Sequence, residues 1–269
     1  MSTLSKARVM SGEDLSPFLK MALYGPPGVG KTGFASDADI SRYPIAPEET
    51  LYINIESGTL TLKVLGRRCA VLDVEKHDPK NGKDPFTHLE QIHKDLLAGG
   101  HGYKTVILDT VSSLQKEDLD TVAQVTIEKT NPANRHHGRF GKQQADYGIN
   151  TDKMRWILRA FRDLPMNVVF VLGETQEKTN TGASRTVPDL TPKLRESLYP
   201  MMDIIAYMYA IVIPEGQDRA GEKQRIFVAG PNPALITKDR SDALGNYLAD
   251  VTLPDVLALV FDRIKVSNS

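Results

Sequence analysis

Eight residues near the N-terminus, Gly25 to Thr32 (GPPGVGKT), constrain the fold of this chain more than any other feature. The segment has almost no apolar surface and costs conformational entropy to order, so it adds little to a core. An apolar run, KMALYG, precedes it and predicts a short buried strand, and a helix is predicted from Thr32 to about Ile40. A strand, this glycine pattern and a helix, in that order, are typical of a phosphate-binding loop.

The residue types of this loop fit a nucleoside triphosphate with Mg²⁺. Glycines let backbone N–H groups converge on phosphate oxygens, and the following helix presents the positive end of its dipole. Lys31 would reach the β- and γ-phosphates, and the Thr32 hydroxyl would bind Mg²⁺. We predict ATP and Mg²⁺ as cofactors, with GTP as an alternative to ATP that the loop does not exclude. The predicted nucleotide contacts are Gly25, Pro26, Pro27, Gly28, Val29, Gly30, Lys31, Thr32 and Gly33.

Beyond the loop, apolar runs alternate with segments of helical spacing. Strands are predicted at residues 49–56, 69–74, 104–109 and 167–173, with helices between them and another at 253–264. Continuous apolar strands of this kind are typical of parallel sheets. Residues 202–213 and 223–230 flank a turn and predict an antiparallel pair, whereas 128–150 and 174–188 are predicted as loops. We therefore expect an α/β fold of three layers, with a mainly parallel twisted sheet and an antiparallel edge.

The domain organisation is predicted to be simple. Residues 1–18 are polar and aperiodic, which is typical of a flexible N-terminal arm, and residues 19–269 are expected to form one domain.

Four polar side chains follow predicted strands and are candidates for the chemistry. Asp109 ends TVILD, on a strand expected to neighbour that of the phosphate loop, and would hold Mg²⁺; capping the next helix is its alternative role. Glu56 ends LYINIE and is the candidate base for an attacking water, unless it is only an exposed strand-end residue. Glu174 and Gln176 follow VVFVLG and are equal candidates to sense the γ-phosphate.

The order of these segments resembles the RecA-like ATPase core over roughly residues 20–245. The segments that carry the resemblance are GPPGVGKT, LYINIESG and TVILDTVSSL, and the last is especially close to the Walker-B segment of RecA. Glu56 falls where that family keeps its catalytic glutamate. PDLTPKLRESLYPMMDIIAYM and KDR resemble phage P-loop proteins that include the Sak-type single-strand annealing ATPases. Many of these relatives carry His near position 174, where this chain has Glu.

Lys238 and Arg240 resemble the K-x-R finger of RecA-type and hexameric-helicase ATPases, which acts in a neighbouring subunit's site. Two cations at positions i and i+2 of an extended segment point the same way and can both reach phosphate. This interpretation implies a homo-oligomer, a ring or a filament, with the ATP site shared between subunits. The alternative is that both residues lie on a solvated edge strand.

A second group of residues suits a single-stranded nucleic acid. The stretch 129–143 carries four cations and no acid, with histidines and one phenylalanine interleaved, as a strand backbone and its bases would require. It occupies a place comparable to a DNA-holding loop of RecA-like proteins, and a solvated loop is the alternative. The candidate DNA-binding residues are Lys129, Arg135, His136, His137, Arg139, Phe140 and Lys142, with Lys178 and Arg185 from the second loop.

Composition excludes several classes of protein. The formal net charge is −1, so no overall positive field draws the chain to nucleic acid, and any such contact must be local. Cys69 is the single cysteine and cannot form an intrachain disulfide. No apolar run approaches the ~20 residues needed to span a bilayer. We expect a cytoplasmic protein without membrane contact, in the host cell if a phage encodes it.

Together these features predict a Mg²⁺-dependent ATPase that oligomerises and binds single-stranded DNA to promote annealing or recombination. A single-strand DNA-binding protein is a further expected partner. The first alternative is an oligomeric P-loop ATPase that unwinds DNA or moves a protein partner. A small-molecule phosphotransferase is less favoured because the arginines form no obvious lid, and a nucleotide-binding scaffold without turnover is a third alternative.

Overall fold

The computed structural model describes residues 18–37, 43, 45–56, 59–78, 81, 83–130, 143–179 and 182–267. Of the predicted N-terminal arm, only Phe18 belongs to this part of the chain. No helix within these ranges is long and apolar enough to cross a membrane.

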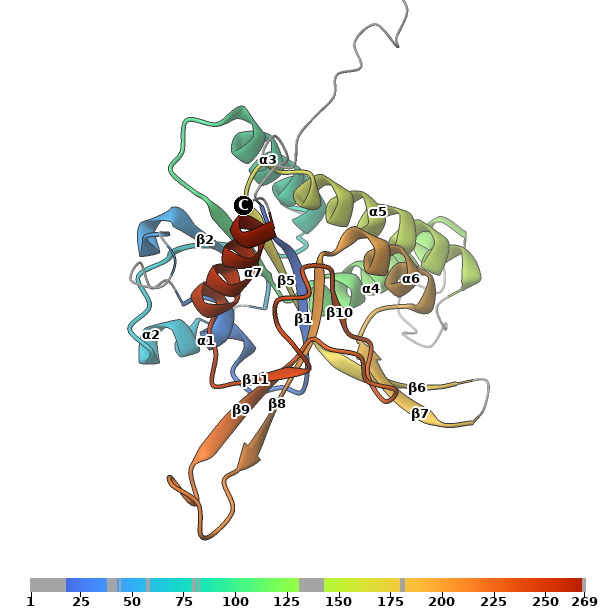
Figure 1. The fold of residues 1–269 in the computed structure, drawn as a ribbon. Coiled ribbons are helices and arrows are strands. Elements are labelled where there is room, and N and C mark those ends of the chain that lie inside the picture. Colours follow the sequence, from blue (N-terminus) through green and yellow to red (C-terminus); the bar gives the residue numbers. More distant parts are fainter. Residues whose placement is uncertain are drawn as a thin grey trace, which may run out of the picture.

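The central feature is a sheet that contains nine of the strands in the described part of the chain (Figure 1). Its strand order is β11-β9-β8-β1-β5-β4-β2-β3, and β10 pairs with β8 outside this path. The pairs from β3 to β8 are parallel, whereas β9, β10 and β11 pair antiparallel. The strands are β1 (Lys20–Tyr24), β2 (Thr50–Asn54), β3 (Ala70–Asp73), β4 (Thr105–Asp109), β5 (Asn167–Leu172), β8 (Ile204–Val212), β9 (Lys223–Val228), β10 (Lys238–Asp239) and β11 (Tyr247–Ala249).

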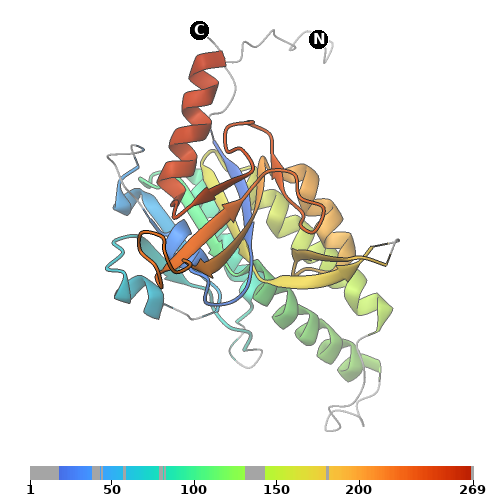
Figure 2. The ribbon, with the colours of Figure 1, turned by 60° about the horizontal axis from the view of Figure 1, so that its bottom comes forward.

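Helices cover both faces of the sheet and give the three layers predicted from the sequence (Figures 1 and 2). One face packs against α1 (Lys31–Ala35), α2 (Leu60–Val64) and α7 (Leu253–Ser267). The other packs against α3 (Pro85–Ala98), α4 (Val111–Thr130), α5 (Gln144–Arg162) and α6 (Pro192–Met201). The short 3-10 helix η3 (Pro47–Glu49) leads into β2.

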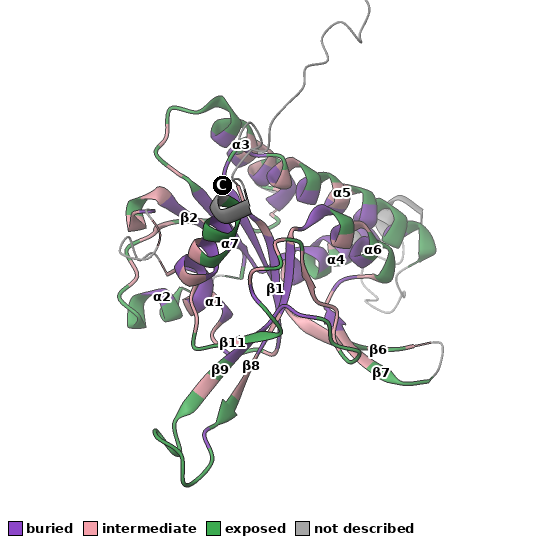
Figure 3. Ribbon diagram, in the orientation of Figure 1, coloured by how far each residue is buried: buried purple, intermediate pink, exposed green. Residues whose placement is uncertain are grey.

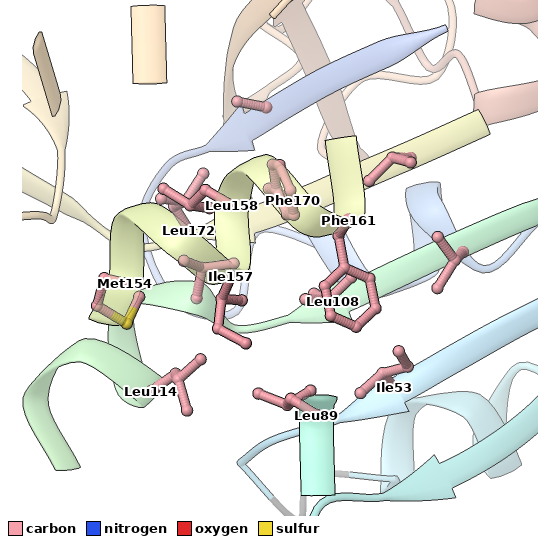
Figure 4. Close-up of a cluster of buried hydrophobic side chains, with 14 of the residues drawn as sticks. Ile53, Leu89, Leu108, Leu114, Met154, Ile157, Leu158, Phe161, Phe170 and Leu172 are labelled. Atoms are coloured by element: carbon pink, nitrogen blue, oxygen red, sulfur yellow. The ribbon is translucent and has the colours of Figure 1, made fainter. Parts of the chain in front are cut away.

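Side chains of the central strands point alternately to the two faces of the sheet, so the sheet contributes to two hydrophobic clusters. In β4, Val106 and Leu108 face the cluster under α3, α4 and α5, whereas Ile107 faces the cluster under α1 and α7. Figure 4 shows the first cluster, where Met154, Ile157 and Phe161 project from one face of α5 onto the strands. The central strands are therefore buried on both faces (Figure 3), which explains their continuous apolar runs.

The strand order corrects one prediction about the site. We expected the strand of Asp109 to neighbour the strand of the phosphate loop, but β5 lies between β1 and β4. The carboxyl ends of β1, β5, β4 and β2 nevertheless share one edge of the sheet, because these strands are parallel and in register. Polar residues that follow them therefore converge at that edge.

Three further expectations about local structure are wrong. The helix predicted from Thr32 to Ile40 ends at Ala35, and residues 38–40 lie outside the described part of the chain. The loop predicted at 128–150 overlaps two helices, since α4 continues to Thr130 and α5 begins at Gln144. The loop predicted at 174–188 contains a two-stranded hairpin, formed by β6 (Glu174–Lys178) and β7 (Ser184–Pro188).

Candidate nucleotide-binding site

The phosphate loop leaves β1 at the carboxyl edge of the sheet and enters α1 at Lys31. Gly28 and Gly30 have φ values of 73° and 104°, which residues with a Cβ adopt at a cost. A Cβ on Gly25 would come within 2.1 Å of the Met208 carbonyl oxygen, so the loop turns tightly against β8. These positions explain why the loop needs glycines, and they match the geometry of an anion cradle.

A cavity of about 640 Å³ opens over this loop and gathers residues from several elements. Nine predicted site residues from separate parts of the chain line the cavity, namely Pro27, Gly28, Gly30, Lys31, Thr32, Gly33, Glu56, Asp109 and Glu174. It also contains residues that the sequence did not single out, among them Leu60, Val64, Thr110, Ser112, Ser113, Lys116, Asp189 and Arg225. Residues predicted separately from the sequence therefore line the same cavity.

Asp109 lies at the base of the cavity and is almost fully buried. Its Oδ2 accepts hydrogen bonds from the Thr32 hydroxyl at 2.7 Å and from the Tyr52 hydroxyl at 2.5 Å. Burial raises the pKa of Asp109, and these two hydrogen bonds oppose that rise. A buried carboxylate beside the hydroxyl of the loop threonine is the oxygen donor set that Mg²⁺ prefers.

Lys31 is buried and folds back over its own loop. Its Nζ donates to the carbonyl oxygens of Gly25 at 2.7 Å and Pro26 at 2.8 Å. Burial lowers the pKa of Lys31, and the nearby carboxylates of Asp109, Glu174 and Glu56 oppose this shift. The ammonium therefore lies within electrostatic reach of all three acids that the sequence placed at strand ends.

Glu56 follows β2 and is held by two hydroxyl groups, one from the residue after β4 and one from the first turn of α4. Thr110 Oγ1 donates to Glu56 Oε1 at 2.8 Å, and the Ser113 hydroxyl donates to the same oxygen. The residue is exposed and lines the cavity, so solvent can reach it. An oriented carboxylate at the open side of the cavity can position a water molecule and accept its proton.

Glu174 and Gln176, which the sequence left as equal candidates, take different positions. Glu174 lines the cavity, and in the described part of the chain its Oε2 is buried without a hydrogen-bond partner. Gln176 is exposed on the β6–β7 hairpin and is not among the cavity residues. Its side chain bonds across the hairpin, donating to Thr186 Oγ1 at 2.9 Å and accepting from Ser184 Oγ at 2.8 Å. Of these two candidates, Glu174 lines the cavity and Gln176 does not.

Lys238 and Arg240 lie far from this cavity, near the amino-terminal end of β8. Lys238 Nζ donates to the carbonyl oxygens of Tyr199 at 2.8 Å and Met202 at 2.6 Å. Arg240 donates to the Pro200 carbonyl at 2.8 Å and pairs with Asp203 at 3.3 Å. Both cations thus bind at the C-terminal end of α6, where the helix dipole favours positive charge.

Few of the candidate DNA-binding residues can be placed. Arg135, His136, His137, Arg139, Phe140 and Lys142 lie outside the described residues, and only the backbone of Lys129 is described, within α4. Lys178 is exposed at the end of β6. Arg185 is partly buried in β7, and one nitrogen of its guanidinium pairs with Glu177 at 3.2 Å.

The residues missed by the sequence prediction fall into three groups. Tyr52, Thr110 and Ser113 position the two carboxylates, and the hydroxyl run TVSS after Asp109 was the available signal for the last two. Arg225 comes from β9 and had no local signal, because only the pairing of β8 with β9 brings it to the loop. Lys116 and Asp189 form an ion pair at 2.5 Å on the cavity wall.

The residues present fit a nucleotide with Mg²⁺. The loop backbone has no room for side chains at Gly25 and Gly30, and Lys31 projects from the first turn of α1. Thr32 and Asp109 supply adjacent oxygen donors. The described residues contain no group of three or more His, Cys, Asp or Glu side chains that could hold a metal ion by themselves.

A comparison with models of protein families gives a match. The family model described as an AAA domain matches residues 18–241, which include the phosphate loop, all the strands from β1 to β10 and the whole cavity. No curated protein matches the chain.

Proposed function

The chain belongs to the AAA domain family of P-loop ATPases, and from this premise we propose that it is a Mg²⁺-dependent ATPase that oligomerises and binds single-stranded DNA. One observation carries the enzymatic part. Lys31, Thr32, Glu56 and Asp109 come from separate elements and line one cavity at the carboxyl edge of the sheet. No single role in stabilising the fold accounts for that convergence.

Each residue has a defined task in the proposed reaction. The loop N–H groups and Lys31 bind the phosphates, and Thr32 and Asp109 would hold Mg²⁺, which supplies charge neutralisation at the phosphate oxygens. Glu56 orients the attacking water and accepts its proton, while Thr110 and Ser113 fix the direction of its carboxylate. Glu174 would report on the γ-phosphate, and in support its Oε2 is buried with no hydrogen-bond partner among the described residues.

The β6–β7 hairpin supports the proposed link between nucleotide and DNA. It begins at Glu174 on the cavity wall and projects from the body of the molecule (Figure 1). Ser112, at the start of α4, accepts a hydrogen bond at 3.0 Å from the N–H of Gly173, just before the hairpin. Lys178 is carried near its outer end. A change at the cavity would therefore reach a polar surface suited to a nucleic-acid backbone.

An oligomer is proposed because Lys238 and Arg240 cannot reach their own cavity. They lie at the opposite edge of the sheet, so any contact with phosphate requires the site of a neighbouring copy. In such a contact, Lys238 and Arg240 would donate to phosphate oxygens in place of the carbonyl oxygens at the end of α6. In this proposal the assembly supports annealing or recombination in the cytoplasm, with a single-strand DNA-binding protein as an accessory partner.

The test is phosphate release from ATP with Mg²⁺, measured with and without oligothymidine, alongside the particle's mass in each state. We expect turnover that oligothymidine stimulates, a mass of several chains, and loss of ATP binding in Lys31→Ala. Unstimulated turnover would refute the DNA part and favour a protein partner. ATP binding by Lys31→Ala equal to that of the wild type would refute the site itself.

A further inference from the structure

The β8–β9 hairpin extends beyond the end of β1 and brings two cations to the phosphate loop. β8 pairs with β1 as far as the Tyr24–Tyr207 pair and then continues to Val212, where it pairs with the start of β9. This overhang projects from the body of the molecule past the end of β1 (Figure 1). Lys223 and Arg225 stand two residues apart on β9, so their side chains share one face of the strand.

Both cations contact the loop of their own subunit. Lys223 Nζ donates to the Gly28 carbonyl oxygen at 3.4 Å, and Arg225 lines the cavity beside Lys31 and Thr32. A Cβ built on Gly30 would lie 2.6 Å from Arg225 Nε and 3.4 Å from its Cζ. The guanidinium therefore packs directly on the backbone of Gly30, the residue that precedes the first turn of α1.

Arg225 differs from Arg219, the other arginine of this hairpin, in its ion pairs. Arg219 is paired with Glu222 at 2.7 Å and with Asp250 at 3.3 Å. Arg225 uses its backbone N–H for Asp250, at 2.9 Å, and in the described part of the chain its guanidinium has no ion pair. An arginine that packs on a phosphate loop and makes no ion pair with any described residue has its donors available for an anion.

We propose that Arg225, assisted by Lys223, binds the phosphate chain of the nucleotide held by its own subunit. This inference rests on the proposed function and deepens it, because it makes the β8–β9 hairpin part of the nucleotide site. The guanidinium presents two parallel N–H donors to phosphate oxygens, which suits it better than an ammonium. It acts within one subunit, whereas Lys238 and Arg240 are placed to act between subunits.

The first experiment measures the affinity of the full chain for ATPγS with Mg²⁺ by calorimetry. We expect Arg225→Ala to weaken binding by about 10- to 100-fold, the effect of losing a charge-assisted hydrogen bond, and Arg225→Lys to fall between Arg225→Ala and the wild type. Arg219→Ala, on the same hairpin but paired with acids, is the matched control and should stay within about twofold. A circular-dichroism melt of each variant confirms folding.

Lys31→Ala separates the two proposals. If Lys31→Ala loses ATPγS binding and Arg225→Ala binds like the wild type, the role of Arg225 is refuted and the nucleotide site stands. If Lys31→Ala also binds like the wild type, the proposed function fails as well.

A mixing experiment tests whether Arg225 acts within its own subunit. Arg225→Ala chains are mixed with Lys31→Ala chains and phosphate release is measured. A residue that acts within its own subunit leaves every site in the mixture defective, so turnover should equal the sum of the separate variants. Recovery of turnover above that sum would mean that Arg225 serves a neighbouring site, and would overturn the proposal.

Discussion

Replacing Tyr52 by Phe would isolate the hydrogen bond that holds Asp109 from beneath the cavity. Tyr52 is 1% exposed and Asp109 is 5% exposed, and their oxygens are 2.5 Å apart. Phe keeps the packing of the ring and removes only the donor. A hydrogen bond to a buried charged group contributes roughly 1.5 to 3 kcal/mol, and each 1.4 kcal/mol corresponds to about a tenfold change in an equilibrium constant.

Loss of the Tyr52–Asp109 hydrogen bond should mainly change how phosphate release depends on the Mg²⁺ concentration. Without the tyrosine, Asp109 keeps Thr32 as its only side-chain donor among the bonds described above, and Thr32 is also the proposed magnesium ligand. We expect the free Mg²⁺ concentration for half-maximal phosphate release to rise about 10- to 100-fold at pH 7. Because burial already raises the pKa of Asp109, removing a donor raises it further, so the defect should grow as the pH falls.

Tyr24→Phe is the matched control. Tyr24 is as buried as Tyr52, and its hydroxyl donates to the Thr186 carbonyl at 3.2 Å and accepts from the Ile236 N–H at 2.9 Å. Both variants should lose roughly 1 to 3 kcal/mol of unfolding free energy, but only Tyr52→Phe should shift the Mg²⁺ response. An unchanged Mg²⁺ response in Tyr52→Phe would refute the role of Tyr52 and weaken the assignment of Asp109.

Three further predictions follow from particular contacts. Asp109→Asn should abolish Mg²⁺-dependent turnover, yet raise the melting temperature of the nucleotide-free protein at pH 7. Because burial raises the pKa of Asp109 in the folded state, this gain in melting temperature should vanish below about pH 4, where the carboxyl is protonated in both states. A melting temperature below that of the wild type at pH 7 would contradict the prediction. Gly30→Ala should weaken nucleotide binding about tenfold through its positive φ and its contact with Arg225, and its effect should be less than additive with Arg225→Ala. Lys238→Ala and Arg240→Ala should leave ATP affinity nearly intact while cutting turnover, and equal loss of both quantities would exclude action between subunits.

The sequence predicts those parts of the site whose functional residues lie next to the strands that position them. The phosphate loop and the strand TVILD carry their chemistry locally, because the glycines, Lys31 and Asp109 stand beside the strands that position them. The same strands predict the fold class, since a parallel sheet buried on both faces needs continuous apolar runs. The strand order was not predictable in this way, because nothing in the local pattern of β5 places it between β1 and β4.

Two segments were wrongly predicted as loops, one because its helix buries polar residues and the other because its hairpin is exposed. The start of α5 buries Asp146, Asn150 and Thr151, so its inner face is polar and lacks an apolar helical period. Asn150 is satisfied by Gln115 and Asp118 of α4, contacts that no local pattern shows. In the β6–β7 hairpin the first strand has no buried residue, so the alternation that marks a half-buried strand is absent.

Arg225 illustrates the remaining limit of local patterns. Lys223 and Arg225 form a K-x-R sequence, as do Lys238 and Arg240, and the spacing is the same. Only the length of β8 beyond β1 decides which pair reaches the phosphate loop. Long-range strand pairing, not residue type, distinguishes the two.

The most direct test of the account is single-turnover phosphate release from Mg²⁺–ATP by Glu56→Gln. If Glu56 orients and deprotonates the attacking water, the rate should fall by about 100- to 10,000-fold while ATP affinity stays within about twofold of the wild type. A rate equal to that of the wild type would show that the carboxylate held by Thr110 and Ser113 takes no part in hydrolysis, and would contradict the catalytic assignment of this cavity.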